Sequence, residues 1–487
     1  MKLYIDDSTN SAKSLYYQSL ILLFLPCEKF GEDSLNNELY VNAFQSNGKN
    51  FVKIKLVVGD RNSTQEANQD IDNSVISQMK NLIGRTLLKA AFKLFNVSPP
   101  WGISTGVKPV KLARILVELF GANEAFSILC DEYMISPSKA KMAIEACLFE
   151  NSIIKGFGDK PCSLYISIPF CPTKCNYCSF VSCTTPRLLS LIPEYMNSLE
   201  RELVRISEII KDLGLNMKSV YVGGGTPAIL SERQIDNLLS TVYGRFNIDN
   251  NCEITFEAGR PDCITYEKLK VLSEYGIPRI SINTQTTNDD ILRSIGRNHS
   301  YSEFLCAFDY ARKLGFKCIN TDLIAGLPGE REKSFFKSVQ DVLSLAPENI
   351  TIHAFTLKKS SYYRTDGLNT YTIDSDAAVR MTDYASELLQ KSCYKPYYVY
   401  RQKNTVGNLE NVGYSIKGFE SIYNIIMMGE YHTVFGAGAG SVTKIVTQNG
   451  CKVDRIFSPK YPYEFLDSNK YSGFDGNAVS DLIRKGD

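Results

Sequence analysis

Three cysteines stand close together in one short segment of this 487-residue chain. Cys171, Cys175 and Cys178 form a C-x3-C-x2-C pattern that directly follows a predicted β-strand. Thiolates are the soft ligands that iron–sulfur clusters require, and a loop of this length can wrap one cluster without regular structure. Structural zinc sites and filled cubane clusters take four protein ligands, whereas three ligands leave one metal position open to a substrate. The spacing therefore predicts a 4Fe-4S cluster with one open iron.

Two neighbouring cysteines bear on the number of cluster ligands. Cys183 is near enough to the triplet to act as a fourth ligand, which would make the group a structural site. Cys162, at the start of the preceding strand, is expected to pack as a small hydrophobe, as are most of the remaining cysteines. Fourteen cysteines in a chain of this length are too dilute for a disulfide scaffold, so a tight cluster in a reducing compartment indicates a metal or redox site.

Strands and helices alternate from Cys162 onward, and this alternation would position the cysteine loop. Short apolar segments predict strands at residues 163–168, 219–223, 253–258, 279–283, 318–324 and 350–355. Ser231 and Gln234 form a capping box before one intervening helix, and Gly276 and Gly315 fall where helix C-caps belong. The repeat predicts an α/β fold with a parallel sheet, built as a partial (β/α)6 barrel because six strands are too few for the closed eight-stranded form. Ligands of such sheets bind beyond the C-terminal strand ends.

Changes of pattern divide the chain into three predicted regions. Residues 1–150 form an N-terminal accessory α+β region, residues 160–358 the barrel core, and residues 359–487 a C-terminal substrate-capping region. The last region is rich in tyrosine and then in glycine. Its segment Gly436–Gly440 lacks the helix and the acidic residue that a dinucleotide fingerprint requires.

Strands precede helices within the first region. Alternating apolar and basic residues at Val52–Leu56 predict a half-buried strand, and the polar segment Gly59–Asn73 predicts a loop. Apolar residues at helical spacing from Met79 to Leu94 then predict a helix. Two further helical segments are expected between Pro109 and Glu150.

Composition argues against several classes of function. The 54 Lys and Arg residues against 53 Asp and Glu residues leave a net charge of +1, which disfavours binding to nucleic acid or to an anionic membrane surface. The apolar run Leu20–Leu25 ends at Pro26 and is too short for a membrane span and wrongly flanked for a secretory signal, so a cytoplasmic protein is expected. The histidines His299, His353 and His432 are far apart in the sequence, which argues against the clustered ligands of a metal hydrolase. His353 is interpreted as a satisfied core histidine.

The cysteine loop and its flanks resemble a known family. Leu164–Cys171 followed by Cys175–Cys178 is similar to the radical S-adenosylmethionine (SAM) signature of oxygen-independent coproporphyrinogen III oxidases, also called dehydrogenases, and looks closest to their HemZ type. The segments Tyr221–Pro227 and Asp322–Pro328, together with Glu257, agree with that family over most of the barrel. A weaker likeness extends to residues 101–106 in front of the barrel and to residues 400–404 and 407–411 behind it.

The resemblance implies one 4Fe-4S cluster held by the three cysteines and one or two molecules of SAM. In this superfamily SAM chelates the open iron, and an electron from the reduced cluster cleaves it to methionine and a 5'-deoxyadenosyl radical. The residues assigned to SAM contact are Tyr165, Tyr177, Gly224, Gly225, Thr226, Glu257, Gln285, Arg297 and Asp322. As a carboxylate Glu257 suits hydroxyl or ammonium donors, and Arg297 suits a carboxylate; a structural or solvated role is the alternative for each polar residue.

The resemblance also implies a tetrapyrrole substrate and a redox partner. The expected reaction is the oxidative decarboxylation of coproporphyrinogen III to protoporphyrinogen IX in haem biosynthesis, with electrons from a low-potential donor such as flavodoxin or ferredoxin. Four propionates on an apolar ring call for Arg or Lys beside aromatic surface, which Arg401 and Lys403 offer after a tyrosine-rich run. A strand with a solvated basic end is the alternative for these two residues.

Two departures from the family pattern keep other functions open. Ser167 replaces the usual histidine of the related dehydrogenases, which puts a direct transfer of their mechanism in doubt but does not affect SAM cleavage. The haem-chaperone branch carries a His-Asn-x-x-Tyr-Trp motif where this chain has Tyr423–Met428, leaving Met427 or Met428 as substitute haem ligands, although both are more typical of a core. The alternatives are therefore a haem-binding chaperone that retains the cluster and a radical SAM enzyme that acts on another tetrapyrrole.

Overall fold

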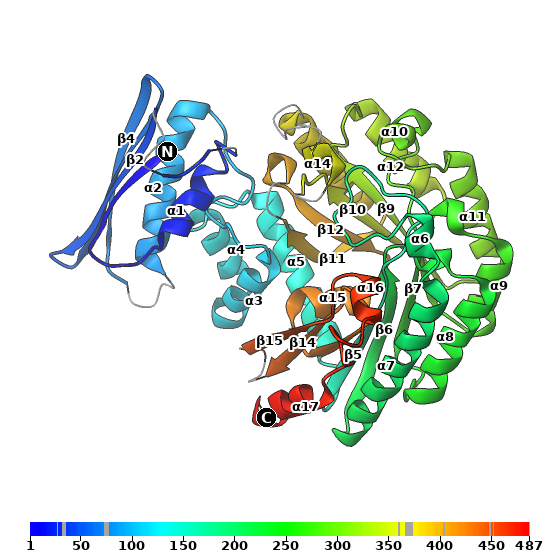
Figure 1. Ribbon diagram of the computed structural model, residues 1–487. Helices are drawn as coiled ribbons and strands as arrows, with labels where there is room; N and C mark the ends of the chain where they lie inside the picture. Colours follow the sequence, from blue (N-terminus) through cyan, green and yellow to red (C-terminus); the bar gives the residue numbers. More distant parts are fainter. Residues whose placement is uncertain are drawn as a thin grey trace. The chain divides into compact units, whose positions relative to one another are not determined.

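The computed structural model describes residues 1–26, 28–31, 36–72, 77–358, 361–365, 374–402, 405–447, 450 and 452–486. Contacts divide the chain into two compact units. Unit 1 comprises Met1–Cys147 and Tyr400–Leu409, and unit 2 comprises Leu148–Val399 and Glu410–Asp487. Figure 1 colours their elements in chain order. The division into accessory, core and capping regions stays a prediction, because it rests on functional roles rather than on contacts.

A four-stranded sheet forms one layer of unit 1. Its strands lie in the order β1 (Lys2–Asp7), β2 (Asn37–Ser46), β3 (Lys49–Val58) and β4 (Arg61–Asp70), with β1 parallel to β2 and the other pairs antiparallel. The strand predicted at residues 52–56 lies within β3. The loop predicted from residue 59 to residue 73 is wrong over the length of β4, which pairs with β3 residue for residue. Polar composition hid this strand: Ser63 is buried and Thr64 exposed, so burial alternates where hydrophobicity does not.

Helix α2 (Gln78–Phe95) packs on this sheet and confirms the helix predicted from residue 79 to residue 94. Its buried apolar side chains share a core with those of α1 (Ser14–Ile21), β2 and β3. Three helices follow where two were expected, namely α3 (Pro109–Phe120), α4 (Ala122–Asp131) and α5 (Pro137–Ile154). The additional break lies at Gly121, whose φ of 80° ends α3 directly before α4 begins.

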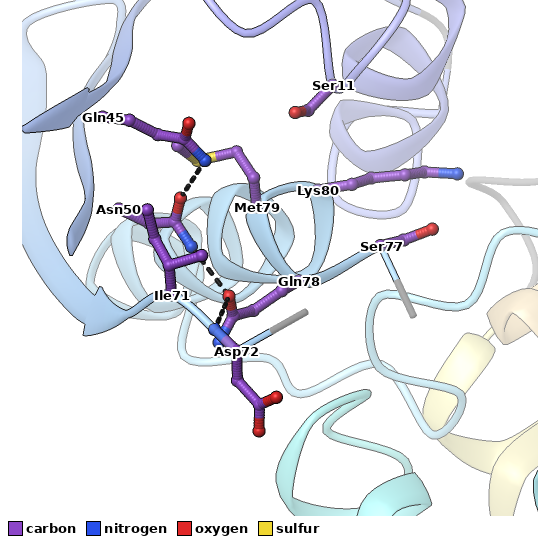
Figure 2. Close-up of a pocket in the computed structure, with 9 residues that line it drawn as sticks. All are labelled: Ser11, Gln45, Asn50, Ile71, Asp72, Ser77, Gln78, Met79 and Lys80. Carbon is purple, nitrogen blue, oxygen red and sulfur yellow. Dashed lines mark hydrogen bonds between the residues drawn. The ribbon is translucent and has the colours of Figure 1, made fainter. Parts of the chain in front are cut away.

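A polar pocket of about 380 Å³ lies beside the first turn of α2 (Figure 2). A chain of carboxamides crosses it, because Gln45 donates to Asn50 and Asn50 donates to Gln78. Gln78 in turn donates to the Asp70 carbonyl oxygen and accepts from the Asp72 amide. Since these amides satisfy one another, we interpret the pocket as the joint between α2 and the β3–β4 hairpin.

Unit 2 is built on an eleven-stranded sheet with the order β11-β12-β10-β9-β8-β7-β6-β5-β13-β14-β15. Its six central strands are β5 (Pro161–Ile168), β6 (Asn216–Gly224), β7 (Glu253–Gly259), β8 (Arg279–Ile282), β9 (Cys318–Ala325) and β10 (Asn349–Ala354). Each pairs in parallel with the next, which confirms the six predicted strands and the partial barrel. The C-terminal ends of all six therefore share one edge of the sheet.

The C-terminal part of the chain adds strands to both sides of this core. β12 (Glu410–Ser415) pairs antiparallel with β10 and is flanked by β11 (Lys395–Arg401). β13 (Thr433–Ala437) pairs in parallel with β5 and is followed by β14 (Val442–Thr447) and β15 (Lys452–Phe457). Residues remote in the sequence thereby come to lie beside the first and last barrel strands.

The helices of unit 2 connect these strands (Figure 1). In chain order they are α6 (Pro186–Leu189), α7 (Ile192–Asp212), α8 (Glu232–Arg245), α9 (Tyr266–Glu274), α10 (Asp289–Ser294), α11 (Tyr301–Lys313), α12 (Glu332–Ser344), α13 (Tyr362–Thr365), α14 (Ser375–Lys391), α15 (Ile422–Gly429), α16 (Pro462–Leu466) and α17 (Gly476–Gly486). The capping box at Ser231 and Gln234 is confirmed before α8, and Gly276 and Gly315 follow helix ends with φ of 67° and 77°. Within the described ranges, every helix is too short or too polar to cross a bilayer.

A buried ion pair holds α15 at the N-terminal end of the barrel strands. Glu253, the first residue of β7, lies 3.2 Å from the Nε of Arg279, the first residue of β8. Both side chains are less than 10% exposed, at 8% and 6%. The Glu253 carboxylate also accepts from the amides of Ile422 (3.0 Å) and Tyr423 (3.1 Å) at the start of α15. One carboxylate thus neutralises a buried guanidinium and caps a helix.

Glu253→Gln should destabilise unit 2 by about 3 kcal/mol, because removing one partner of a buried ion pair leaves the other charge uncompensated. Denaturant unfolding followed by near-ultraviolet circular dichroism measures this change. Glu387→Gln is the matched control, because Glu387 and Lys391 form an exposed pair on α14 with side chains 67% and 70% accessible. Equal, small effects of the two substitutions would contradict the role given to Glu253.

Candidate functional site

The three cysteines of the triplet lie on the loop that follows β5, at the C-terminal edge of the barrel strands. Cys171 and Cys175 are buried, with 7% and 8% exposure, and Cys178 is partly exposed. The Cys178 amide donates to the Cys175 carbonyl oxygen over 3.0 Å, which turns the chain back between these two residues. The three cysteines therefore lie on a short loop without helix or strand, and their role as cluster ligands stays a prediction.

Cys183 supports this loop from behind. Its amide donates to the Pro169 carbonyl oxygen (2.9 Å), and its carbonyl oxygen accepts from the Cys171 amide (3.1 Å). Its side chain is 2% exposed and belongs to the main apolar core of unit 2, and burial raises the pKa of its thiol. This placement suits a packing role for Cys183, and the assignment of the three other cysteines as ligands stays a prediction.

The glycine-rich turn after β6 lies directly against the cysteine loop. The Gly225 amide donates to the Ile168 carbonyl oxygen and the Thr226 amide to the Phe170 carbonyl oxygen, both over 2.8 Å. The Thr226 hydroxyl lies 3.3 Å from the Cys171 sulfur. A Cβ at Gly225 would stand 2.5 Å from the Phe170 oxygen and 2.9 Å from the Cys171 sulfur, so no larger residue fits without displacing the loop.

The donor set fits a cluster better than a single ion. No three His, Cys, Asp or Glu side chains in the described part of the chain converge closely enough to hold one metal ion. A cubane presents its irons at separate corners, so its thiolate ligands need not meet at one point. Burial raises the pKa of the Cys171 thiol to about 11 and raises that of Cys178 as well. Metal binding reverses this effect, because a coordinated thiol loses its proton.

Arg260 is a site residue that the sequence analysis missed. It follows β7 directly, is 3% exposed, and places its Nη1 3.6 Å from the Cys175 sulfur. The same nitrogen donates to the hydroxyl (2.8 Å) and carbonyl oxygen (3.2 Å) of Thr173, and Asp262 pairs with the guanidinium at 2.7 Å. Arg260 therefore fastens the cysteine loop to the end of β7 and places a buried cation beside the Cys175 sulfur. Arg260 could have been found from the sequence, because it directly follows a predicted strand and ligands of such sheets bind beyond the C-terminal strand ends.

Arg297 and Tyr177, both predicted site residues, are in contact. The Arg297 Nε donates to the Tyr177 hydroxyl over 3.3 Å, and its Nη1 donates to the Asn283 carbonyl oxygen over 2.6 Å. The side chain of Asn176 donates to the Ser294 carbonyl oxygen, which joins the cysteine loop to the segment before Arg297. Arg297 is 6% exposed, so its guanidinium is an inward-held cation rather than a solvated one.

Gln285 and Asp322 are also brought together. The Gln285 amide donates to the Asp322 carbonyl oxygen (2.9 Å), and the Gln285 carbonyl oxygen accepts from the Ile324 amide (3.0 Å). Gln285 has a φ of 72°, a strained value for a residue other than glycine, and β9 holds it in that conformation from both sides. Strain of this kind is typical of functional sites.

Glu257 is in a different charge state from the one that its assigned role assumed. Burial and the nearby charge of Asp322 raise its pKa to about 8, so most of the carboxyl group is protonated at neutral pH. The role predicted from the sequence was that of an ionised carboxylate that accepts hydrogen bonds. The space around it is tight, because a Cβ at Gly223 would lie 2.7 Å from the Glu257 Oε2.

Three tyrosines stack beside Glu257. The Tyr221 and Tyr423 rings are 4.3 Å apart at 22°, and Tyr165 lies 6.0 Å from Tyr423 at 18°. Tyr165 was a predicted SAM contact, whereas Tyr221 and Tyr423 were not singled out for this site. Tyr423 comes from α15, whose first turn Glu253 caps, so a residue from the C-terminal part of the chain completes an aromatic group within the barrel.

Of the two residues predicted to bind the substrate, one belongs to unit 1 and the other is outside the described ranges. Arg401 is buried in unit 1, where its guanidinium lies 5.8 Å from the Trp101 ring and donates to the carbonyl oxygens of Ser104 and Asn408. Lys403 is outside the described residues. The assignment of both to the propionates stays a prediction.

Comparisons with known proteins agree with the geometry of the cysteine loop. A family model for the Radical SAM superfamily matches residues 165–342. The chain is 35% identical to the oxygen-independent coproporphyrinogen-III oxidase-like protein HemZ of Bacillus subtilis, over 81% of this chain and 79% of that protein. The chain belongs to the radical SAM superfamily. Within it, the chain is a member of the HemZ-like group.

Two further comparisons bear on fold and function. The heme chaperone HemW of Bacillus subtilis is 29% identical over 62% of this chain and 77% of its own length. The structure of coproporphyrinogen III oxidase (HemN) from Escherichia coli, a radical SAM enzyme, is similar to this chain with a TM-score of 0.52. The two chains are 20% identical over 66% of this chain and 71% of HemN. The likeness to HemN supports the barrel fold.

Cys175→Ala should prevent cluster loading after anaerobic reconstitution, because two thiolates cannot hold the cubane. Cys183→Ala should retain the iron and sulfide content of the wild-type chain, since its thiol packs in the core. Iron and sulfide analysis, with the visible absorption of the cluster, measures both variants. Equal loss of iron in the two variants would overturn the ligand assignment.

Proposed function

We propose that this radical SAM protein is an oxidoreductase that converts coproporphyrinogen III to protoporphyrinogen IX. The observation that carries the proposal is the 35% identity with HemZ, which extends over four fifths of the chain and beyond the barrel itself. The cluster, when bound to Cys171, Cys175 and Cys178, supplies the electron that cleaves SAM. A low-potential donor such as flavodoxin or ferredoxin would deliver that electron.

The residues of this chain have separable tasks in the proposal. The glycine turn at Gly224 and Gly225 offers backbone groups to SAM beside the cluster loop, since no Cβ intervenes. Arg297 is a buried cation suited to the SAM carboxylate, and Glu257 and Asp322 provide oxygens for its hydroxyl and ammonium groups. The tyrosine stack fills the space beside Glu257 with apolar surface, which limits the access of water to a reactive primary radical.

A haem-delivery function is the second candidate, and the identity with HemW favours it. Of the two methionines that could substitute as haem ligands, Met427 already has another partner. The Met427 sulfur accepts from the Lys444 Nζ over 2.7 Å and packs with an apolar cluster around Ile426. Tyr423, which stands where the chaperone motif begins, is buried in the tyrosine stack. These contacts support the oxidoreductase over the chaperone.

Anaerobic incubation with SAM, a reductant and coproporphyrinogen III should yield a product lighter by two carbon dioxide units plus hydrogens, together with 5'-deoxyadenosine. Mass spectrometry of the tetrapyrrole and chromatography of the nucleoside measure the two products. Stoichiometric haem binding without any 5'-deoxyadenosine would instead establish the delivery function. Products of another mass would indicate a different tetrapyrrole reaction.

The affinity for SAM should rise between about pH 6.5 and 8.5, by up to about tenfold per pH unit below the pKa of Glu257. The affinity rises with pH because a ligand that donates to the Glu257 carboxylate must first displace the proton of that group. Above pH 8 the carboxyl group is already ionised, so the free-energy cost of removing the proton disappears. Glu257→Gln should bind SAM more weakly and without that slope, at unchanged iron content. Equilibrium dialysis of reconstituted protein measures both, and a wild-type dissociation constant independent of pH would remove Glu257 from the contact.

A further inference from the structure

His353 lies between two polar side chains on the inner side of the barrel. It belongs to β10, and its Nε2 is 3.5 Å from the Oδ2 of Asp322 on the neighbouring strand β9. Its Nδ1 is 3.2 Å from the Oδ1 of Asn411 on β12, the neighbouring strand on the other side. The imidazole therefore bridges three strands, and each of its nitrogens faces an oxygen.

The orientation of Asn411 determines the protonation of the ring. The Ala354 amide donates to the Asn411 Oδ1 over 3.1 Å, so this atom is the carbonyl oxygen of the carboxamide and not its nitrogen. An oxygen cannot donate, and the His353 Nδ1 must therefore carry a proton to bond with it. The Nε2 faces a carboxylate and carries the second proton. With Asp322 ionised, both contacts are satisfied together only by the imidazolium.

Charged neighbours agree with this state. Among the described residues, the titratable groups that act on His353 are Asp322 from β9 and Glu257 from β7, while β12 contributes the neutral Asn411. Burial alone would lower the pKa of His353, but its contacts with Asp322 and Asn411 outweigh burial and raise it. Burial alone would raise the pKa of Asp322, but His353 and Asn320, which donates over 2.8 Å, hold it below its usual value.

The other two histidines provide an internal contrast. His432 has its Nε2 2.9 Å from the Ser163 hydroxyl, and burial lowers its pKa to about 3. Burial and the charge of Arg297 likewise lower the pKa of His299 to about 3. His432 and His299 are therefore neutral at pH 7, whereas the contacts of His353 with Asp322 and Asn411 favour its imidazolium.

We propose that His353 is a positioning residue for SAM: its imidazolium keeps Asp322 ionised and holds that carboxylate in one orientation, so that Asp322 can accept hydrogen bonds from ligand hydroxyls. The proposal rests on the proposed function only in taking SAM as the ligand of Asp322. Without the imidazolium, Asp322 loses the partner that offsets the effect of its burial, so its pKa rises and protonation becomes easier. A protonated Asp322 loses part of its capacity to accept hydrogen bonds. The sequence predicts a satisfied core histidine at this position, and the proposal adds a role in SAM binding to that structural role.

The charge state can be read directly, because the full chain contains three histidines. Nitrogen-15 NMR of selectively histidine-labelled protein, without reconstitution, should show one imidazole with both nitrogens protonated at pH 7 and two neutral rings. His353→Gln should remove the charged signal, and Asp322→Asn should lower its titration midpoint by about one pH unit or more. A neutral His353 at pH 7 in the wild-type chain would overturn the proposal.

SAM binding tests the consequence of that charge. Reconstituted His353→Gln should have a dissociation constant for SAM raised roughly tenfold at pH 7, as expected when a hydrogen bond to a charged group is lost. Asn411→Ala should act in the same direction but less strongly, because it removes one of the two acceptors. His432→Gln, which replaces a buried neutral histidine, should bind SAM like the wild-type chain, and iron content should be equal in all variants.

The outcomes separate this proposal from the proposed function. Normal SAM affinity in folded, iron-loaded His353→Gln would refute the role of His353, even if the wild-type chain forms the vinyl product. Absence of the vinyl product would refute the proposed reaction, while a charged His353 and a weakened SAM affinity in its variant would still support the positioning role. A general loss of folding in the variant would appear as lost iron, and the NMR titration of the wild-type chain then decides.

Discussion

Two backbone hydrogen bonds hold the glycine turn after β6 against the cysteine loop after β5, and the candidate site depends on that contact. The donors are the Gly225 and Thr226 amides and the acceptors are the Ile168 and Phe170 carbonyl oxygens. Because β5 and β6 are parallel neighbours, both segments leave the sheet at the same edge. The close approach excludes a side chain at Gly225. Backbone hydrogen bonds alone thus fix the position of the glycine turn relative to the cysteine loop.

Electrostatics inside the barrel follow from placing two carboxyl groups near each other in a buried setting. Two neighbouring carboxyl groups disfavour each other's ionisation, so the pKa of one of them rises. The other partners of Glu257 and Asp322 determine which of the two carboxyl groups it is. Asp322 has a cation beside it in His353 and a donor in Asn320, and it stays ionised. Glu257 has weaker compensation and keeps its proton near neutral pH. The pair therefore presents one ionised acceptor, Asp322, and one largely protonated carboxyl group, Glu257.

Local patterns in the sequence predicted much of the fold and the cluster loop. The six barrel strands were readable from apolar runs, and the capping box at Ser231 depends on residues three apart. The strand β4 could not be predicted from the sequence, because its side chains are polar and backbone groups make its pairing with β3. Arg260 and Asn411 act on residues that are distant in sequence, Cys175 and His353. Such contacts depend on strand register, which a single sequence does not specify.

Segments after the barrel complete the site, and they explain why Ser167 can replace a histidine. The Ser167 hydroxyl donates to the Ala439 carbonyl oxygen over 2.8 Å, and the Tyr195 hydroxyl bridges the Ser167 carbonyl oxygen and the Ala439 amide. The turn between β13 and β14 is therefore fastened to β5 at this position, and a Cβ at Gly438 would lie 2.8 Å from the Ser167 oxygen. Ser167 is 4% exposed, so a larger imidazole at this position would require the turn to shift. The serine at position 167 is therefore part of the contact by which this chain joins the turn after β13 to β5.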